Sequence, residues 1–321
     1  DHRIVHSGQH YDPCLSDNFF TALAIPAPDL SLAIGSGSHG HQTGAMLAAL
    51  EDVFAAELPD WVLVYGDTNT TLAAAIAAVK LHLPLAHLEA GLRSFNRRMP
   101  EEHNRVLTDH AADLLLAPTQ VAMEHLRDEG LGRRSRLVGD VMTDVCYRVA
   151  GSVRPGWRDQ PGPARRPFLL ATIHRPDNTD DPDRLEAIIQ ALADLEPPVR
   201  LAAHPRLRAK AAEFQIALER PGLELIEPLA YPAMVAAVLD AAGVVTDSGG
   251  LQKEAYLLAR PCTTVRPETE WVETLEDGWN VLAPDPAGIA AAATRLWPSR
   301  PPGQPYGDGQ AAAKVAQALI E

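Results

Sequence analysis

The chain has 321 residues, of which 46% are hydrophobic, and its formal net charge is −14 because 42 acidic residues face 28 basic ones. This balance argues against a nucleic-acid or anionic-membrane partner, and no apolar run approaches the length of a membrane span. The three cysteines, Cys14, Cys146 and Cys262, form no metal or disulfide pattern, so we expect a reducing, cytoplasmic setting.

The first half of the chain alternates short apolar strands with helices. We predict strands at 1–6, 32–34, 61–65, 85–88, 114–117 and 136–138. Helices are expected at 43–58, 70–81, 104–112, 119–129 and 141–149. A doubly wound domain normally has a strand and a helix before the first of these elements, so we expect that the first βα unit is missing here.

A stretch rich in Pro, Gly and Arg at 151–166 is typical of a linker, and a second alternation follows it. Its strands are expected at 168–173, 199–203, 223–226, 243–246 and 261–265, and its helices at 182–195, 206–219, 232–241, 251–258 and 310–320. We therefore predict an α/β fold with two Rossmann-like domains, 1–150 and 167–300, that face a central cleft.

Two successive strands of the first half each end on a carboxylate. Asp67 follows the strand at 61–65 and Glu89 follows the strand at 85–88, at the sheet edge where open α/β sheets bind ligands. Glu101 and Arg105 follow shortly afterwards. A carboxylate directly after an apolar strand is costly unless it is paired, solvated or used, so the combination predicts a site. For Asp67 alone, N-capping of the next helix is the alternative.

The run 246–254 (TDSGGLQKE) is the strongest local signal for phosphate. Gly249 and Gly250 let backbone N–H groups approach an oxyanion, and the helix N-terminus adds partial positive charge. Ser248 can donate its hydroxyl, and Glu254 can accept hydrogen bonds from sugar hydroxyls, as acids do in ribose recognition. The alternative is a plain Ser/Gly turn that caps a helix.

Two histidines stand at matching strand ends in the second half. His174, followed by Arg175, comes after the strand at 168–173, and His204 comes after the next strand. Histidine titrates near neutrality and can serve as acid, base or phosphate partner, although a lone histidine after a strand is more often structural. Gln9 and His10 also stand at a strand end.

Two further segments carry charge near the same edges. Glu270 follows the strand at 261–265 and can join the site or form a plain surface ion pair with an arginine. The segment 93–98 (RSFNRR) reads as a flexible, positively charged loop that can close over an anion or remain solvated.

With these residues assembled, the chain closely resembles the non-hydrolysing UDP-N-acetylglucosamine 2-epimerases over nearly its whole length. The matching runs are Gly8-Gln9-His10, Gly66-Asp67-Thr68, 87–93 (HLEAGLR), 100–105 (PEEHNR), Thr172-Ile173-His174-Arg175, His204-Pro205, 246–255, 266–273 and 305–309. The resemblance implies a two-domain GT-B-type fold, a segment 301–321 whose helix returns to the N-terminal domain, and a homodimer. It implies a UDP-sugar substrate and no metal or redox cofactor.

The resemblance also implies a mechanism. UDP leaves by anti elimination as the C2 proton is lost, which gives 2-acetamidoglucal, and then adds back syn with the proton on the other face. Asp67, Glu89, Glu101 and His174 match the family's catalytic positions. The residues predicted to bind substrate and UDP are Arg105, His204, Ser248, Gly249, Gly250, Glu254, Gln9, His10, Arg175 and Glu270.

The chain departs from the family pattern at its start, where the family's N-terminal strand and Gly-Thr-Arg-Pro-Glu loop are absent. The stretch 35–43 (GSGSHGHQT) resembles a subgroup that includes epimerases of UDP-2,3-diacetamido-glucuronic acid. That substrate is one alternative, and a hydrolysing 2-epimerase, a GT-B glycosyltransferase and a non-catalytic UDP-sugar sensor are others. The acids of the first half favour chemistry on the donor sugar itself over glycosyl transfer.

Overall fold

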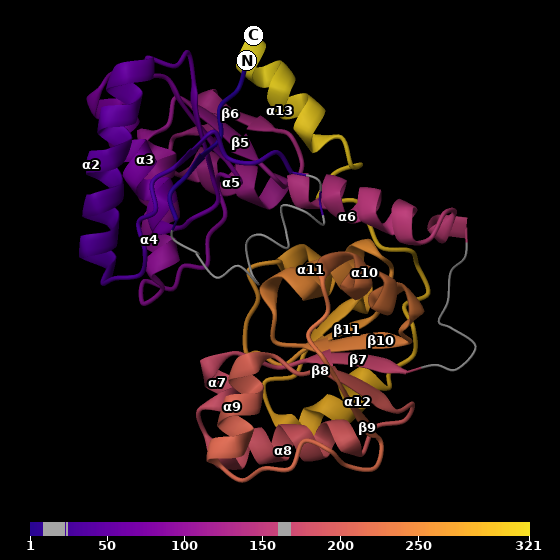
Figure 1. Cartoon of the computed structure of the whole chain (residues 1–321). Helices are drawn as coiled ribbons and strands as arrows, with labels where there is room; N and C mark the ends of the chain where they lie inside the picture. Colours follow the sequence, from indigo (N-terminus) through magenta and orange to yellow (C-terminus); the bar gives the residue numbers. More distant parts are fainter. Residues whose placement is uncertain (9–22, 24, 160–167) are drawn as a thin grey trace. The chain divides into compact units, whose positions relative to one another are not determined.

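The computed structural model describes residues 1–8, 23, 25–159 and 168–321. The chain divides into two compact units (Figure 1). Unit 1 consists of Asp1–Asp144 and Gln304–Glu321, and unit 2 consists of Val145–Gly303. Within the described ranges, no helix combines the length and the apolar composition that crossing a membrane requires.

Unit 1 contains two parallel sheets, β1-β2 and β3-β4-β5-β6. The strands are β1 (Val5–His6), β2 (Leu30–Ser31), β3 (Val62–Tyr65), β4 (Leu85–Leu88), β5 (Leu114–Ala117) and β6 (Ser135–Leu137). The helices are α2 (His39–Glu57), α3 (Asn69–Lys80), α4 (Pro100–Ala111), α5 (Gln120–Asp128), the short 3-10 helix η1 (Gly132–Arg134) and α13 (Ala311–Ile320), while α6 (Val141–Val153) continues into unit 2. Parallel neighbours require a crossover connection, and a helix supplies it between β3 and β4 and between β4 and β5.

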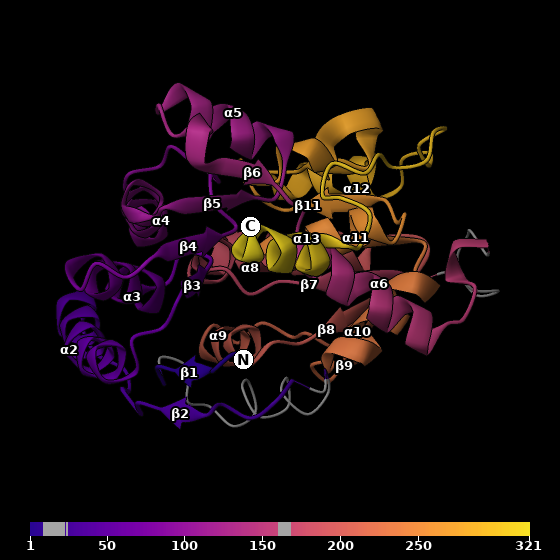
Figure 2. The same ribbon diagram turned by 90° about the horizontal axis from the view of Figure 1, so that it is seen from above.

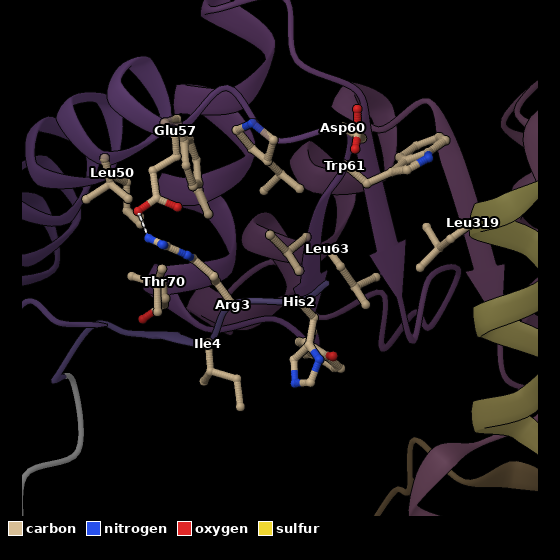
Figure 3. Close-up of a pocket in the computed structure, with 18 of the residues that line it drawn as sticks. His2, Arg3, Ile4, Leu50, Glu57, Asp60, Trp61, Leu63, Thr70 and Leu319 are labelled. Carbon is tan, nitrogen blue, oxygen red and sulfur yellow. Dashed lines mark hydrogen bonds and ion pairs between the residues drawn. The ribbon is translucent and has the colours of Figure 1, made fainter. Parts of the chain in front are cut away.

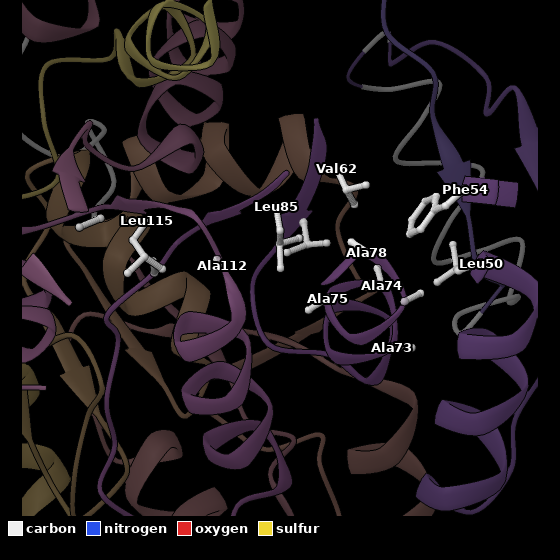
Figure 4. Close-up of a cluster of buried hydrophobic side chains, with 14 of the residues drawn as sticks. Leu50, Phe54, Val62, Ala73, Ala74, Ala75, Ala78, Leu85, Ala112 and Leu115 are labelled. Atoms are coloured by element: carbon white, nitrogen blue, oxygen red, sulfur yellow. The ribbon is translucent and has the colours of Figure 1, made fainter. Parts of the chain in front are cut away.

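Alternate residues of the unit 1 strands point to opposite faces of the sheet. Leu85 and Leu115 pack with the Ala-rich face of α3 and with α2 (Figure 4). Leu88 and Leu116 point the other way, toward Val315 of α13. A sheet covered on both faces needs strands that are apolar at every position, which explains the uninterrupted apolar runs in the sequence.

A cavity of about 750 Å³ lies in unit 1 between strands of the two sheets. Val5 of β1 lines it. Leu63 of β3 and Trp61 line it as well (Figure 3). Arg3 and Glu57 form an ion pair among the lining residues. The cavity is therefore mainly apolar, with charged groups contributed by the first residues and by the end of α2.

Unit 2 is a single six-stranded parallel sheet in the order β12-β11-β10-β7-β8-β9. The strands are β7 (Leu169–Thr172), β8 (Val199–Ala202), β9 (Leu223–Ile226), β10 (Gly243–Thr246), β11 (Cys262–Thr264) and β12 (Asn280–Leu282). The helices are α7 (Pro176–Thr179), α8 (Pro182–Ala193), α9 (Pro205–Glu213), α10 (Tyr231–Asp240), α11 (Gly249–Leu257) and α12 (Ile289–Ala293), with 3-10 helices η2 (Trp157–Asp159), η3 (Val272–Gly278) and η4 (Pro286–Gly288). The strand order reverses between β7 and β10, and ligands bind at such a switch point in doubly wound sheets.

Helices cover both faces of the unit 2 sheet. Figures 1 and 2 show α10 and α11 on one face and α8 and α12 on the other. Leu185 and Ile189 of α8 and Ile289 of α12 are fully buried in one core cluster with the strands. The prediction of an α/β fold with parallel sheets is confirmed.

Several element bounds differ from their predictions for identifiable reasons. The helix predicted at 206–219 ends at Glu213, because Gln215 takes a left-handed conformation (φ 60°) and the N–H of Ile216 donates to Ala211. Helix α6 runs on to Val153, into the stretch predicted as a linker, and stops before Pro155, which cannot continue a helix. Strand β12 was not predicted, since its three residues carry a weak pattern.

Candidate functional site

Asp67 lies directly after β3 and is held by an arginine. Nη2 of Arg105 donates to Oδ2 of Asp67 at 2.5 Å, and Nδ2 of Asn104 donates to its backbone carbonyl at 2.9 Å. The N-cap of α3 is Thr68, so the capping alternative for Asp67 is wrong. Burial raises the pKa of Asp67 although Arg105 acts in the opposite direction. A carboxyl group with raised proton affinity is suited to proton transfer near neutral pH.

Glu89 follows β4 and reaches back toward the end of β3. Its backbone is in the left-handed region (φ 74°), which is uncommon for a residue with a side chain. A Cβ atom on Gly66 would lie 3.2 Å from Oε2 of Glu89, so the glycine leaves room for this carboxylate. Glu89 and Gly66 line the same cavity, of about 130 Å³. The structure thus brings Glu89 close to the residue that precedes Asp67.

Glu101 and Glu102 begin α4 but have different surroundings. Glu101 is exposed, and its charge acts on Asp67. Glu102 is buried and accepts hydrogen bonds from N and Oγ of Ser94 and from N of Phe95, at 2.8 to 2.9 Å. Burial works to raise the pKa of Glu102, but these hydrogen bonds bring it below its usual value. Glu102 therefore fixes the loop before α4, while Glu101 stays accessible.

The prediction of a flexible, positive loop at 93–98 is wrong for Arg93. Its side chain is 1% exposed and pairs with Asp109 and Glu129, both at 2.7 Å. A guanidinium that is buried between two carboxylates is not available to close over an anion. The spacing of arginines in the sequence did not distinguish this internal one from its exposed neighbours.

In unit 2, His174 and Asp247 meet at the switch point, since they follow β7 and β10. Nδ1 of His174 lies 3.0 Å from Oδ1 of Asp247. Asp247 is fully buried and also accepts from N of His174, N of Arg175 and Nδ2 of Asn178 at 2.9 to 3.1 Å. Burial works to raise the pKa of Asp247, but His174 and these donors hold it below its usual range.

Asp247 was not among the predicted site residues, although its sequence context carries a recognisable signal. Asp247 is a carboxylate directly after an apolar strand, the same pattern that drew attention to Asp67. Its partner Asn178 lies on the short helix α7, which the sequence analysis also did not predict. Three residues of the loop at 174–178 are thus fixed through one buried acid.

His204 lies beside His174, with ring centroids 5.1 Å apart. It is the N-cap of α9, where its Nδ1 accepts a hydrogen bond from N of Arg206 at 3.1 Å. Burial, and then the neighbouring His174, lower the pKa of His204. The two histidines at matching strand ends therefore form a pair with rings tilted by 33°, and because Nδ1 of His204 accepts a hydrogen bond, its ring proton lies on Nε2.

In the loop after β10, one side chain caps the next helix and one glycine lies very close to a glutamate. Oγ of Ser248 accepts from N of Leu251 at 3.4 Å, so this side chain caps α11 as the alternative explanation expected. A Cβ atom on Gly249 would lie 2.4 Å from Oε1 of Glu270, whereas one on Gly250 would meet nothing within 4 Å. The predicted glycines therefore differ, because only Gly249 is required by its neighbour.

Glu270 forms an ion pair with Arg266 at 2.8 Å, and their side chains are 23% and 7% exposed. The expected pairing with an arginine is therefore present, but the pair is largely buried and does not lie on the open surface. Burial works to raise the pKa of Glu270, but the Arg266 guanidinium brings it below its usual value.

Glu254 lies one turn into α11 and is enclosed. Burial raises its pKa to about 7, against the opposing effects of the Tyr231 hydroxyl and the charge of Lys253. A glutamate with this pKa is half protonated near neutrality, so its capacity to accept hydrogen bonds changes with pH.

The predicted residues thus fall into two groups. Unit 1 brings Asp67, Arg105 and Glu89 together, with Glu101 on the next helix. Unit 2 brings together His174 and His204, with Arg175 held by the same Asp247, and places Ser248, Gly249 and Glu270 in one loop region. Gln9 and His10 lie outside the described residues. Their roles in binding and catalysis remain predictions.

The family model for UDP-N-acetylglucosamine 2-epimerase matches residues 1–320. A UDP-2,3-diacetamido-2,3-dideoxy-D-glucuronate 2-epimerase from Pseudomonas aeruginosa is 46% identical over 99% of this chain and 91% of its own length. A UDP-N-acetylglucosamine 2-epimerase from Methanocaldococcus jannaschii is 37% identical over the same shares of the two chains.

Solved structures give the same result. The Methanocaldococcus jannaschii enzyme in complex with UDP-GlcNAc and UDP superposes with a TM-score of 0.85 at 35% identity, over 99% of this chain and 91% of that one. The Neisseria meningitidis enzyme bound to UDP-GlcNAc has a TM-score of 0.85 at 26% identity, over 97% and 90% of the two chains. The fold is therefore of the GT-B type. The chain belongs to the UDP-N-acetylglucosamine 2-epimerase family.

Proposed function

We propose that this protein is a non-hydrolysing 2-epimerase that interconverts UDP-N-acetylglucosamine and UDP-N-acetylmannosamine. The observation that carries the proposal is the placement of Asp67 at the end of β3, held by the buried Arg105 and next to the Glu89 approach at Gly66. Two carboxylates at neighbouring strand ends suit a reaction that moves a proton off and onto one carbon. Membership of the family supports this assignment.

The C2 proton of the sugar is not adjacent to a carbonyl and is poorly acidic, so departure of UDP must assist its removal. In the elimination, a carboxylate takes the C2 proton, the C–H electrons form the C1–C2 double bond, and the C1–O electrons leave with UDP. Re-addition returns UDP oxygen to C1 and delivers a proton to the opposite face of C2. We assign Asp67, Glu89 and Glu101 to proton transfer and to stabilising positive charge at C1.

The unit 2 residues are assigned to the nucleotide. His174, with its ring fixed by Asp247, is assigned to the diphosphate and the leaving oxygen. The loop at Ser248, Gly249 and Gly250, at the N-terminus of α11, is assigned to the phosphates, since exposed backbone N–H groups there attract anions. Glu254 is assigned to the ribose. The remaining residues assigned to binding of substrate and UDP are Arg105, His204, Arg175, Glu270, Gln9 and His10.

A second substrate, UDP-2,3-diacetamido-glucuronic acid, is favoured by one observation. The Pseudomonas aeruginosa relative that acts on this sugar is 46% identical to the chain, against 37% for the Methanocaldococcus jannaschii relative. Both substrates require the same elimination and re-addition at C1 and C2. They differ in the substituents at C3 and C6, which take no part in these bond changes.

Proton NMR of each UDP-sugar incubated with the protein in heavy water tests the proposal. Deuterium at C2 together with the C2 epimer, and no free sugar, is the expected result. Release of UDP with free N-acetylmannosamine would instead make the protein a hydrolysing 2-epimerase. UDP binding without turnover of either sugar would make it a sensor, and turnover only with an added acceptor a glycosyltransferase.

We also propose that the protein acts in the cytoplasm as a homodimer. Cys146 and Cys262 are buried cysteines, which is consistent with a reducing compartment. Multi-angle light scattering of the purified chain should give twice the 34.6 kDa mass of one chain. A mass equal to one chain at the concentrations used for activity assays would contradict the dimer.

A further inference from the structure

His87 lies in β4, two residues before Glu89, and its side chain is completely buried. Both ring nitrogens make close polar contacts. Nδ1 lies 2.6 Å from Oδ1 of Asp109, and Nε2 lies 2.8 Å from the carbonyl oxygen of Gly66. His87 is not among the predicted site residues, and it takes no part in the proposed proton transfers.

Both partners of His87 are acceptors. A backbone carbonyl can only accept, so the contact to Gly66 requires a proton on Nε2. Asp109 accepts from N of Gly91 at 3.1 Å and pairs with Arg93 at 2.7 Å, both through Oδ2. Burial works to raise the pKa of Asp109, but His87 and Arg93 hold it below its usual value, so it is a carboxylate and needs a donor at Nδ1.

Arg93 extends this cluster toward the surface. It joins Asp109 to Glu129, whose side chain is 28% exposed, and Glu129 also lies 3.9 Å from the exposed His110. Glu129 is therefore solvated, and the requirement for two ring protons on His87 rests on the acceptors at its two nitrogens.

We propose that His87 is a positioning residue, held as a buried imidazolium with a proton on each ring nitrogen, which fixes the turn at Gly66 and places a positive charge close to Asp67. The Gly66 carbonyl belongs to the peptide that joins Gly66 to Asp67, so the hydrogen bond from Nε2 orients the backbone of Asp67 directly. Gly66 has φ 61° and makes room for Glu89. One ring therefore holds the turn that brings two candidate catalytic acids together.

The charged groups around His87 come from four segments. Asp67 follows β3, Arg93 follows β4, Asp109 lies on α4, and Glu129 follows α5. Burial raises the pKa of Asp67, Arg105 opposes this rise, and His87 adds a smaller opposing effect. The catalytic consequence of this charge rests on the proposed epimerase function, whereas the protonation state of His87 does not.

NMR of protein labelled with 15N in its histidine rings tests the protonation state. His87→Gln assigns the His87 signals among the twelve histidines. We expect both nitrogens of His87 to carry protons at neutral pH, because each faces an acceptor. Asp109→Asn, which keeps an acceptor oxygen but removes the charge, should leave one ring nitrogen of His87 without a proton in the same spectrum. A bare ring nitrogen on His87 at neutral pH in the unsubstituted protein would overturn the proposal.

The kinetic arm uses His87→Gln, whose amide can donate to Gly66 but carries no charge. We expect kcat to fall about tenfold with KM changed less, and the acidic limb of kcat/KM to move up by about 0.5 to 1 pH unit, because a nearby cation lowers the pKa of a carboxyl group. His41→Gln, at an exposed position of α2, is the matched control and should match the unsubstituted enzyme.

The two arms separate failure of this proposal from failure of the proposed function. A pH profile of His87→Gln that coincides with that of the parent enzyme would remove the electrostatic role. Absence of epimerisation by the parent enzyme would instead refute the proposed function, and the NMR measurement would still decide the protonation of His87.

Discussion

At the scale of single residues, neighbouring charged groups in this chain have unlike environments. Glu102 is buried and fixes a loop, while Glu101 beside it is exposed. Asp67 is partly exposed and held by one arginine, whereas Asp247 is fully buried and held by four donors. Proton transfer needs an accessible group with shifted proton affinity, so Asp67 is the better candidate for chemistry and Asp247 for positioning.

Asp67→Asn tests the assignment of this acid. The amide oxygen can still accept from Arg105, so the local geometry should survive, but proton transfer by this group is lost. We expect kcat for epimerisation to fall by at least about 100-fold, while UDP affinity changes by less than about threefold. Steady-state kinetics and calorimetric titration with UDP measure the two quantities.

Asp52→Asn, at an exposed position of α2, is the control for Asp67→Asn and should leave both quantities unchanged. Equal loss of turnover and UDP affinity in Asp67→Asn would show that Asp67 serves binding, and its role in proton transfer would then be abandoned.

Glu254 makes the stability of the protein depend on pH. Because burial raises its pKa from a usual 4.5 to about 7, the folded state holds this proton more tightly than the unfolded state. The contribution is fully favourable below about pH 4.5 and is lost as pH rises through about pH 7. We expect Glu254→Gln to match the parent near pH 4 and to be more stable by on the order of 2 kcal/mol above about pH 7.

Denaturant unfolding followed by circular dichroism across this pH range measures the difference for Glu254→Gln. Glu219→Gln, an exposed substitution in the same unit, should show no such trend. A constant difference between Glu254→Gln and the parent at all pH values would argue against a raised pKa.

At the scale of elements, the start of α11 offers a matched pair of glycines. Gly249→Ala places a Cβ 2.4 Å from Oε1 of Glu270, so the Glu270–Arg266 ion pair must move. We expect it to destabilise the protein by about 1–3 kcal/mol. Gly250→Ala meets no atom within 4 Å and should be neutral or stabilising by up to about 1 kcal/mol, because alanine favours helix.

Thermal unfolding of the two alanine variants compares them directly. A similar loss of stability in Gly249→Ala and Gly250→Ala would mean that the proximity of Glu270 does not explain why residue 249 is a glycine. UDP titration of Gly250→Ala adds a separate result, since weakened binding without destabilisation would support close approach of phosphate there.

Element types were predictable where strands are buried on both faces. The strands at 85–88, 114–117 and 243–246 agree with their predictions residue for residue, because their apolar runs have clear ends. Short elements such as β12 and α7 were missed, since three or four residues give little periodicity. Helix α9 was predicted too long because nothing local marks the left-handed turn at Gln215.

The proximity of site residues was predictable for residues that follow strands adjacent in the chain. Asp67 and Glu89 could be expected together because β3 and β4 are adjacent in the chain and parallel. The pairing of His174 with Asp247 could not, because it depends on β7 and β10 becoming neighbours across 73 residues of chain. Likewise, the burial of Arg93 depends on Asp109 and Glu129, which come from two later helical segments.

At the scale of the whole molecule, unit 1 combines residues that precede unit 2 in the sequence with residues that follow it. Helix α13 covers one face of its sheet through Val315 and Ala318. The carboxylate of Asp144, on α6, caps α13 by accepting from N of Ala311 at 3.0 Å and N of Ala312 at 2.8 Å. The stability of the sheet in unit 1 therefore depends on a capping contact between segments more than 160 residues apart.

Asp144→Ala removes this cap. We expect the free energy of unfolding of unit 1 to fall by about 1–2 kcal/mol, because two backbone N–H groups lose a charged acceptor. Hydrogen exchange should accelerate in 311–320 and leave β7 to β10 unchanged. Asp285→Ala, which removes the cap of η4 in unit 2, should accelerate hydrogen exchange in unit 2 and leave 311–320 unchanged. Uniform acceleration in both units by either variant would show that the effect of the cap is not confined to its own unit.

The contribution of α13 to unit 1 has a consequence for biosynthesis. A ribosome produces the residues of unit 2 before those of α13, so unit 2 can fold while the sheet of unit 1 still exposes the apolar face formed by Leu88, Leu116 and their neighbours. Until residues 311–320 emerge, that face is available to chaperones. The candidate catalytic acids at the ends of β3 and β4 therefore gain their final support only after unit 2 has been synthesised, which gives the nascent chain little opportunity to act on substrate early.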